Sequence, residues 1–258
     1  MMHGWRRIPT PQRPSSPPWA RATPPPPSTP PKPPTSSWRP PRGELVCLLG
    51  VSGGGKTTLF NIISGLLMPD EGQVLLDGQD ITGKPGSISY MLQKDLLLPY
   101  RTIEDNVALP LLLKGAKKQE ARARGAPLFA QFGLEGTQKK YPAQLSGGMR
   151  QRAALLRTYL FSQDVALLDE PFSALDTLTK SAIHRWFLDV MAQIQLSALF
   201  ITHAIDEAIL LSDRIYLLCG SPGTITAEIV IHEPKPRPAD FNLTSEFLSY
   251  KRQILELL

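Results

Sequence analysis

A glycine-rich segment between an apolar run and a helix-forming run constrains the fold most strongly. Residues 45–49 are apolar, residues 50–58 read GVSGGGKTT, and residues 56–66 have the apolar spacing of a helix. In such a turn the glycines let backbone N–H groups point inward, and the helix N-terminus adds positive potential, so that together they bind phosphate. A chance match to this spacing has a probability on the order of one per cent at average glycine usage. The segment therefore predicts a phosphate-binding loop between a strand and a helix.

The residues of this loop have separate predicted roles. The Lys56 side chain reaches the terminal phosphates of a nucleotide, and the Thr57 hydroxyl is a ligand for magnesium. The other residues offer backbone N–H groups. The predicted phosphate-binding residues of the loop are Gly50, Ser52, Gly53, Gly54, Gly55, Lys56, Thr57 and Thr58.

Two further segments carry chemistry. Residues 164–170 read DVALLDE, and because side chains alternate along a strand, Asp169 and Glu170 can take different tasks at its end. We expect Asp169 to hold magnesium through water and Glu170 to orient or deprotonate an attacking water. Residues 145–148 read LSGG before a second helix. Ser146 can cap that helix while Gly147 and Gly148 expose its first N–H groups, which predicts a second phosphate site.

From Glu44 onward, apolar strands alternate with amphipathic helices, which predicts an α/β fold with a largely parallel sheet. No convincing strand lies between Gln93 and Gln163, so this stretch is expected to form an inserted helical lobe. Strands are expected at 45–49, 87–91, 165–168, 199–202 and 214–218, with a hairpin near 73–76 that turns at Asp77-Gly78. Helices are expected at 56–66, 103–113, 117–132, 148–161, 178–195 and 205–211.

The order of the motifs resembles that of the nucleotide-binding domains of ABC transporters. The matching elements are the phosphate loop, the LSGG signature, the strand-end Asp-Glu pair, SALD at 173–176 and ITH at 201–203. The resemblance covers residues 44–258 and implies a P-loop NTPase fold with a helical subdomain at about 94–163. Within this family, residues 90–102 (YMLQKDLLLPYRT) are similar to importers of nitrate, taurine, alkanesulfonates and thiamine precursors.

The resemblance also implies roles that the isolated residues only permit. Gln93 would contact magnesium and the attacking water, His203 would contact the γ-phosphate, and Asp176 would run along a dimer interface. Taken alone, Gln93 reads as a surface residue, His203 as a core histidine and Asp176 as a helix N-cap. The predicted catalytic residues are thus Glu170, His203 and Gln93, the predicted metal ligands are Thr57, Gln93 and Asp169, and the implied cofactors are ATP and magnesium.

The implied partners include a second copy of the chain. In the resemblance, ATP lies between the loop of Lys56 on one copy and the loop of Ser146 on the other, and transmembrane permease subunits dock near residues 98–102. An extracytoplasmic solute-binding protein would deliver the cargo. The chain has no apolar stretch of about 20 residues, and its two cysteines lack metal or disulfide spacing. We therefore expect a peripheral protein at the cytoplasmic face of the membrane.

Residues 1–42 differ from the rest in every measure. They hold fifteen of the 26 prolines and three of the four tryptophans, but no Leu, Val, Phe or Tyr. They also carry seven of the 28 basic residues and no acidic one, which leaves 21 basic against 23 acidic residues in the remainder. The net charge of +5 is therefore no indication of nucleic-acid binding by the body. Such a segment is expected to be disordered.

The abrupt change at Gly43 suggests an error of reading frame upstream. The resemblance implies N-terminal strands and an aromatic residue that stacks on adenine. Residues 1–42 have no alternating apolar run and no Tyr or Phe, and Trp19 or Trp38 would be makeshift stackers at best. The bias toward Pro, Arg, Ser and Trp is typical of GC-rich DNA translated out of frame. The other interpretation is a true disordered arm, such as a Pro-x-x-Pro ligand or a basic tether to anionic lipid.

Two other functions are compatible with the motifs. One is a soluble single-cassette ABC ATPase, which would not copurify with membrane subunits. The other is an inactive variant, since the N-terminal strands and the adenine-stacking residue are missing. An ATPase assay on the chain as written separates this second alternative from an active transporter subunit.

Overall fold

The computed structural model describes residues 42–162, 164–173, 177–220, 222–238 and 240–258. All of them belong to one compact unit, Trp38–Leu258. The expectations for residues 1–41 and for Asp176 lie outside the described residues. Within the described part of the chain, no helix is long and apolar enough to cross a membrane.

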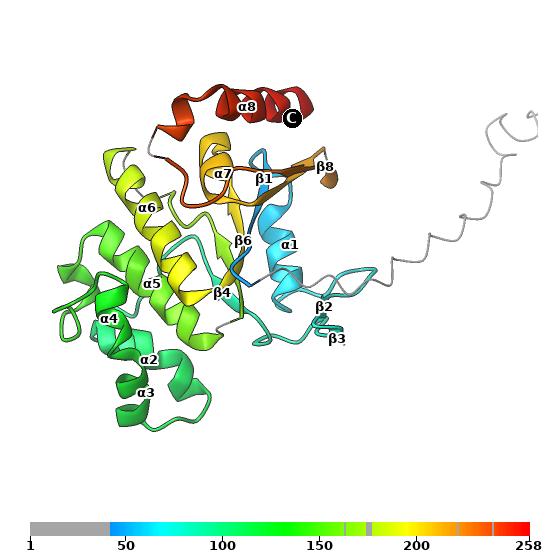
Figure 1. Ribbon diagram of the computed structural model, residues 1–258. Coiled ribbons are helices and arrows are strands. Elements are labelled where there is room, and N and C mark those ends of the chain that lie inside the picture. Colours follow the sequence, from blue (N-terminus) through cyan, green and yellow to red (C-terminus); the bar gives the residue numbers. More distant parts are fainter. Residues whose placement is uncertain (1–41, 163, 174–176, 221, 239) are drawn as a thin grey trace, which may run out of the picture. The chain divides into compact units, whose positions relative to one another are not determined.

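The core of the fold is a six-stranded sheet in the order β4-β5-β6-β1-β7-β8 (Figure 1). The first five strands in this order run parallel to their neighbours, and β8 pairs antiparallel with β7. The strands are β1 (Leu45–Gly50), β4 (Ser89–Met91), β5 (Val165–Asp169), β6 (Ser197–Thr202), β7 (Arg214–Cys219) and β8 (Thr224–Val230). A separate hairpin consists of β2 (Leu75–Leu76) and β3 (Gln79–Asp80).

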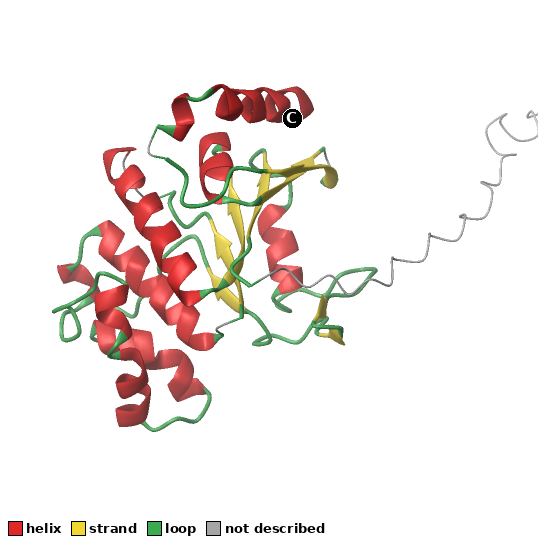
Figure 2. Cartoon of the chain, in the orientation of Figure 1, coloured by secondary structure: helices red, strands yellow, loops and turns green. Residues whose placement is uncertain are grey.

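Helices follow most strands, as Figure 2 shows. The helices that come after β1, β5, β6 and β8 are α1 (Lys56–Ile63), α6 (Thr177–Ile194), α7 (Ile205–Leu211) and α8 (Ser245–Leu257). Those between β4 and β5 are α2 (Ile103–Leu113), α3 (Lys118–Gly125), α4 (Leu128–Gln131) and α5 (Gly147–Phe161). Short 3-10 turns lie at Pro142–Gln144 and Phe241–Leu243.

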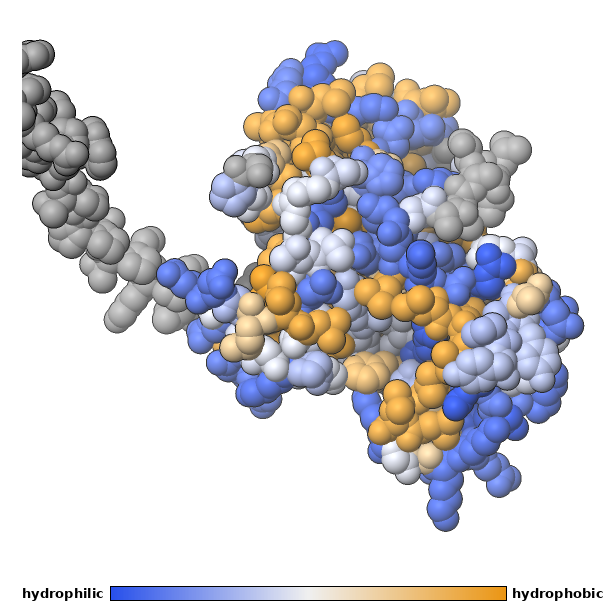
Figure 3. Space-filling view, turned by 180° about the vertical axis from the view of Figure 1, so that it is seen from behind, coloured by the Kyte–Doolittle hydropathy of each residue, from blue (hydrophilic) through white to orange (hydrophobic). Residues whose placement is uncertain are grey.

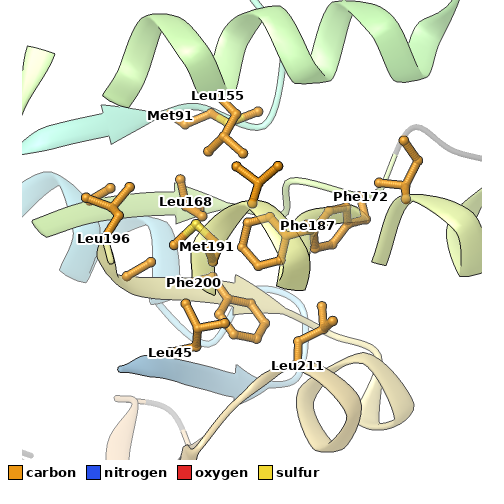
Figure 4. Close-up of a cluster of buried hydrophobic side chains, with 14 of the residues drawn as sticks. Leu45, Met91, Leu155, Leu168, Phe172, Phe187, Met191, Leu196, Phe200 and Leu211 are labelled. Atoms are coloured by element: carbon orange, nitrogen blue, oxygen red, sulfur yellow. The ribbon is translucent and has the colours of Figure 1, made fainter. Parts of the chain in front are cut away.

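The two faces of the sheet pack into two separate hydrophobic clusters. Alternation along β5 sends Leu168 to one face and Leu167 to the other. The larger cluster joins the sheet to α5, α6 and α7, and Figure 4 shows its centre around Leu168, Phe187 and Phe200. The smaller cluster joins the sheet to α1 through Phe60. The phosphate-loop helix and the signature helix α5 therefore belong to different clusters.

Most of the predicted elements are confirmed within one or two residues, although α1 ends at Ile63 rather than at the predicted Leu66. Pro127 interrupts the single helix expected at 117–132, since a proline there cannot donate to the preceding turn, and two helices form instead. Strand β8 and helix α8 were not predicted. Helix α8 buries only Phe247 and Ile254, one apolar position per two turns, which is too sparse a stripe to stand out in the sequence.

Candidate active site

The phosphate-binding loop spans the turn from β1 to α1 and needs glycine for two different reasons. Gly53 and Gly55 have φ angles of 83° and 89°, a left-handed conformation that favours glycine. A Cβ added at either position would meet no atom within 4 Å, so the space before them is open. At Gly50 a Cβ would lie 2.4 Å from the Leu218 carbonyl oxygen of the neighbouring strand β7. Close packing against β7 therefore requires glycine at position 50, whereas the backbone conformation favours glycine at positions 53 and 55.

Lys56, the first residue of α1, is buried at the base of this loop. Its Nζ donates to the carbonyl oxygens of Gly50 at 2.8 Å and of Val51 at 2.7 Å. Burial lowers the pKa of the ammonium group, and the carboxylates of Glu170 and Asp169 oppose that shift. The cation is thus held by backbone carbonyls in a position from which it can turn to a phosphate. Ser52, Gly54, Thr57 and Thr58 lie in the same turn or on the first turn of α1.

Thr57 and Asp169, predicted to share a magnesium ion, lie together. Thr57 Oγ1 donates to Asp169 Oδ2 at 3.2 Å, and the Tyr90 hydroxyl donates to the same oxygen at 3.4 Å. Burial raises the pKa of Asp169, and the neighbouring carboxylate of Glu170 raises it further. A cation would remove this penalty, because it stabilises the charged carboxylate.

The donor set fits a hard divalent cation. Hydroxyl and carboxylate oxygens are the ligands that magnesium prefers, and magnesium usually keeps several waters and binds substrate phosphates as well. Among the described residues, no group of three or more His, Cys, Asp or Glu side chains could hold a metal. Magnesium bound here would take the rest of its coordination from Gln93, water and nucleotide phosphates.

Two of the predicted catalytic residues, Gln93 and His203, contact the carboxylate of the third, Glu170. Gln93 Nε2 donates to Oε2 at 3.0 Å, and His203 Nδ1 lies 3.3 Å from Oε1. The Glu170 backbone has φ of 45°, a strained left-handed conformation for a residue with a side chain. Its N–H donates to the Ile201 carbonyl, and its own carbonyl accepts from the Ser173 hydroxyl and N–H. These bonds hold the backbone of Glu170 in its strained conformation.

Sheet register explains why residues so distant in sequence meet. Strands β4, β5 and β6 run parallel and pair in the order Met91 with Leu168 and Asp169 with Ile201. The strands therefore end at one edge, where Gln93, Glu170 and His203 follow them. The carboxyl edge of a parallel sheet is the usual place for a ligand site.

The signature serine lies apart from this cluster. Ser146 is exposed and caps α5 by accepting from the Met149 N–H at 3.3 Å, while Gly147 and Gly148 form the first turn. Arg150, one turn further on, donates from Nη1 to the Leu145 carbonyl at 3.0 Å and from Nε to the Asp95 carboxylate at 3.1 Å. The signature loop is thereby tied to the segment that follows Gln93. The sequence did not predict the bond of Arg150 to Asp95 or that of Tyr90 to Asp169. Arg150 lies two residues after the LSGG signature, and Tyr90 lies three residues before Gln93.

Comparison with known proteins identifies the family of this chain. A family model described as ABC transporter matches residues 35–173. The chain belongs to the ABC transporter ATP-binding family. It is 48% identical to the formylaminopyrimidine import ATP-binding protein ThiZ of Halalkalibacterium halodurans over 179 residues. These residues make up 69% of this chain and 70% of that protein. It is 38% identical over 222 residues to the nitrate import ATP-binding protein NrtD of Synechocystis, 84% of each chain.

A solved structure supports the same ABC fold. The dimeric, post-hydrolysis state of the ATP-binding cassette MJ0796, bound to ADP and Pi, is 30% identical to this chain. It superposes with a TM-score of 0.62 over 75% of this chain and 88% of that one. The predicted P-loop NTPase fold is therefore confirmed, and the chain is an ATP-binding and ATP-hydrolysing subunit of the ABC family.

Proposed function

We propose that this ATPase powers the import of a small polar solute, of the nitrate, sulfonate or pyrimidine type. The convergence of Gln93, Glu170 and His203 beside the phosphate-binding loop carries the catalytic part of the proposal. The cargo class rests on the names of its relatives, which include importers of formylaminopyrimidine and nitrate. The cargo itself would be delivered by an extracytoplasmic solute-binding protein, with no nucleic acid involved.

In the proposed reaction each side chain has one task. Lys56 turns from its carbonyl partners to the terminal phosphates, and the loop N–H groups bind the phosphate oxygens. Thr57, Asp169 and Gln93 would hold magnesium, which neutralises charge on the transferred phosphoryl group when bound. Glu170 accepts the proton of the attacking water or orients it, and His203 donates a hydrogen bond to the γ-phosphate.

The reaction requires two copies of the chain. Ser146, with Gly147 and Gly148, offers a second helix N-terminus, at the start of α5, in addition to the one at Lys56 that opens α1. A head-to-tail pair would place each Ser146 against the partner's nucleotide. The dimeric MJ0796 structure supports this assembly.

An apolar groove beside α2 supports docking of the permease subunits. It has a volume of about 390 Å³ and joins the C-terminal half of α2 to the segment after Gln93. Its rim includes Leu66, Leu96 and Leu113, whose side chains are mostly exposed, and Tyr100 of the expected contact segment is also exposed. Figure 3 shows that hydrophobic side chains reach the surface in patches. Leu96 in the lining of the groove lies two residues before the expected contact at 98–102. Permease binding there would keep the protein at the cytoplasmic face of the membrane.

We expect Leu113→Glu to abolish the association with permease subunits without lowering basal ATP hydrolysis. A carboxylate in the groove would have to lose its hydration on docking, which costs more than the apolar contact it replaces. Leu243→Glu is the matched control, because Leu243 is 77% exposed and Leu113 is 78% exposed, yet Leu243 lies in the C-terminal region. Coexpression with candidate permease genes, followed by copurification from membranes, measures both.

If Leu113→Glu copurifies with the permease as well as the Leu243→Glu control does, this groove is not the docking site. Loss of both variants would indicate that added charge alone prevents association. Failure of the unaltered chain to copurify with any permease would favour the soluble single-cassette ATPase.

We also propose that residues 1–42 are read out of frame. Among the described residues, the α1 side of the sheet is open in a groove of about 390 Å³. Residues of six strands line it, among them Val46, Leu167 and Leu199. Parallel sheets are normally covered on both faces. At the rim, the β2–β3 hairpin has two residues per strand and, among the described residues, pairs with no other strand, although three strands are usually needed for stability. An additional layer of antiparallel strands would cover the open face of the sheet and would give the β2–β3 hairpin further strands to pair with.

Sequencing and translating the other two frames of the DNA behind residues 1–42 tests this proposal. We expect alternating apolar residues with a Tyr or Phe roughly thirty positions before Lys56, able to stack on adenine. The corrected chain should bind ATP about 5- to 150-fold more tightly than the chain as written, which corresponds to the ~1–3 kcal/mol of base stacking. Isothermal titration measures both affinities. Stop codons in both frames would leave residues 1–42 as a genuine arm.

A further inference from the structure

We infer that Glu207 is a positioning residue that holds the turn carrying His203 against Glu170. The inference rests on the proposed roles of His203 and Glu170 and adds a residue that neither the motifs nor the mechanism assigned. Glu207 lies in the first turn of α7, four residues after His203, and is only 7% exposed.

The turn between β6 and α7 is organised by Thr202, the residue before His203. Its hydroxyl donates to Glu207 Oε2 at 2.7 Å and accepts from the Ala204 N–H at 3.1 Å. The N-cap position of α7 is occupied by Ala204, which has no side chain able to cap the helix. The pair of Thr202 and Glu207 therefore replaces an ordinary cap and fixes the backbone on both sides of His203.

His203 needs such a fixed backbone. Its side chain is 54% exposed, so packing around the ring cannot set its position. A ring nitrogen 3.3 Å from Glu170 depends on the turn beneath it. A shift of the turn by about 1 Å is enough to lower turnover 100-fold in a preorganised site.

The other oxygen of Glu207 connects this turn to α6. Lys180 Nζ donates to Oε1 at 2.8 Å, and His184 Nε2 lies 3.7 Å from the same atom. The His184 ring contacts Phe172 edge to face, with ring centroids 4.8 Å apart. Phe172 follows Glu170 by two residues, so Glu207 links the His203 turn to the segment that carries Glu170.

The charge on Glu207 is maintained by this environment. Burial alone would raise the pKa of the carboxyl group, but His184, Lys180 and Thr202 beside it outweigh burial and lower the pKa to about 2. The carboxylate is therefore ionised at all pH values at which the enzyme would work. The carboxylate accepts hydrogen bonds from Thr202 and from Lys180 of α6 at the same time. The neutral amide of a glutamine has only one oxygen that can accept such bonds.

The competing explanation is that Glu207 and Thr202 only stabilise the fold. Two substitutions at Thr202 distinguish this explanation from the positioning of His203. Thr202→Val keeps the shape of the side chain and leaves Glu207 paired with Lys180, but removes the hydroxyl. Thr202→Ser keeps the hydroxyl and is the conservative rescue. Glu207→Gln removes the charge. We expect kcat to fall roughly 10- to 100-fold in Thr202→Val and Glu207→Gln, with KM for ATP within about twofold, and to recover in Thr202→Ser.

A double substitution tests whether the effect passes through His203. In a His203→Ala background, Thr202→Val should lower kcat no further, because the group it positions is gone. Multiplicative losses, or a lower melting temperature at unchanged kcat, would overturn the inference. If His203→Ala itself leaves kcat unchanged, the proposed role of His203 fails instead.

A readout that needs no hydrolysis keeps the test independent of activity. NMR spectra of the chain with labelled histidine rings, assigned with single His variants, report the order of the His203 ring. We expect the His203 signals to broaden or split in Thr202→Val and to be restored in Thr202→Ser, while the His232 signals stay unchanged. Unchanged His203 signals in Thr202→Val would contradict the inference even in a chain without ATPase activity.

Discussion

Replacement of Glu170 by glutamine is expected to lower ATP turnover by roughly 10²- to 10⁴-fold, the contribution of a general base. Glutamine has the same shape and retains an oxygen to accept from Gln93, which lies 3.0 Å from the carboxylate. It cannot take a proton from water, however. Because the phosphate-binding loop and Lys56 are untouched, ATP affinity should stay within a few-fold of the original. Steady-state hydrolysis and nucleotide titration measure the two effects separately.

Glu135→Gln is the control for this substitution. Glu135 is exposed in the turn after α4, away from the described contacts of the site. It should hydrolyse ATP at the original rate. Turnover in Glu170→Gln equal to that of the Glu135→Gln control would remove Glu170 from the mechanism, and its strained φ of 45° would then need another explanation.

An equal mixture of Lys56→Ala and Ser146→Arg chains is expected to recover activity that neither variant has alone. Lys56→Ala removes the cation of the phosphate loop, and Ser146→Arg blocks the helix N-terminus proposed to bind the partner's nucleotide. A heterodimer combines one doubly damaged site with one intact site. With random pairing, about a quarter of the original sites are restored, because half of the dimers are mixed and each has one good site.

Hydrolysis by the mixture, compared with each variant at the same total concentration, is the measurement. Sedimentation with ATP gives a second readout, since mixed dimers should form where neither variant dimerises alone. A mixture with no gain in hydrolysis and no mixed dimer would show that each nucleotide is held by a single chain. The Lys56→Ala chain alone should also lose ATP affinity, because Lys56 is the proposed phosphate-binding cation of the loop.

The sequence by itself determined the local elements and the identity of the chemistry. Phosphate binding depends on glycines and a lysine that are contiguous in the chain, so residues 50–58 could be assigned without coordinates. The hairpin at Asp77-Gly78 is likewise local, and both residues have positive φ angles, 52° and 77°, as the turn requires. Strands β1, β5 and β7 were recognisable because their apolar runs are buried in a parallel sheet.

Only the tertiary structure decided how the distant residues meet. The assignments of Gln93 and His203 came from family resemblance, and the structure brings both side chains to Glu170 through the parallel register of β4, β5 and β6. The buried contacts of Glu207 with Thr202 and Lys180 leave no signal in the sequence, since an acidic residue in the first turn of a helix is ordinary there. Contiguous motifs are set by local backbone chemistry, whereas these contacts depend on strand order and helix packing, which a single sequence does not specify.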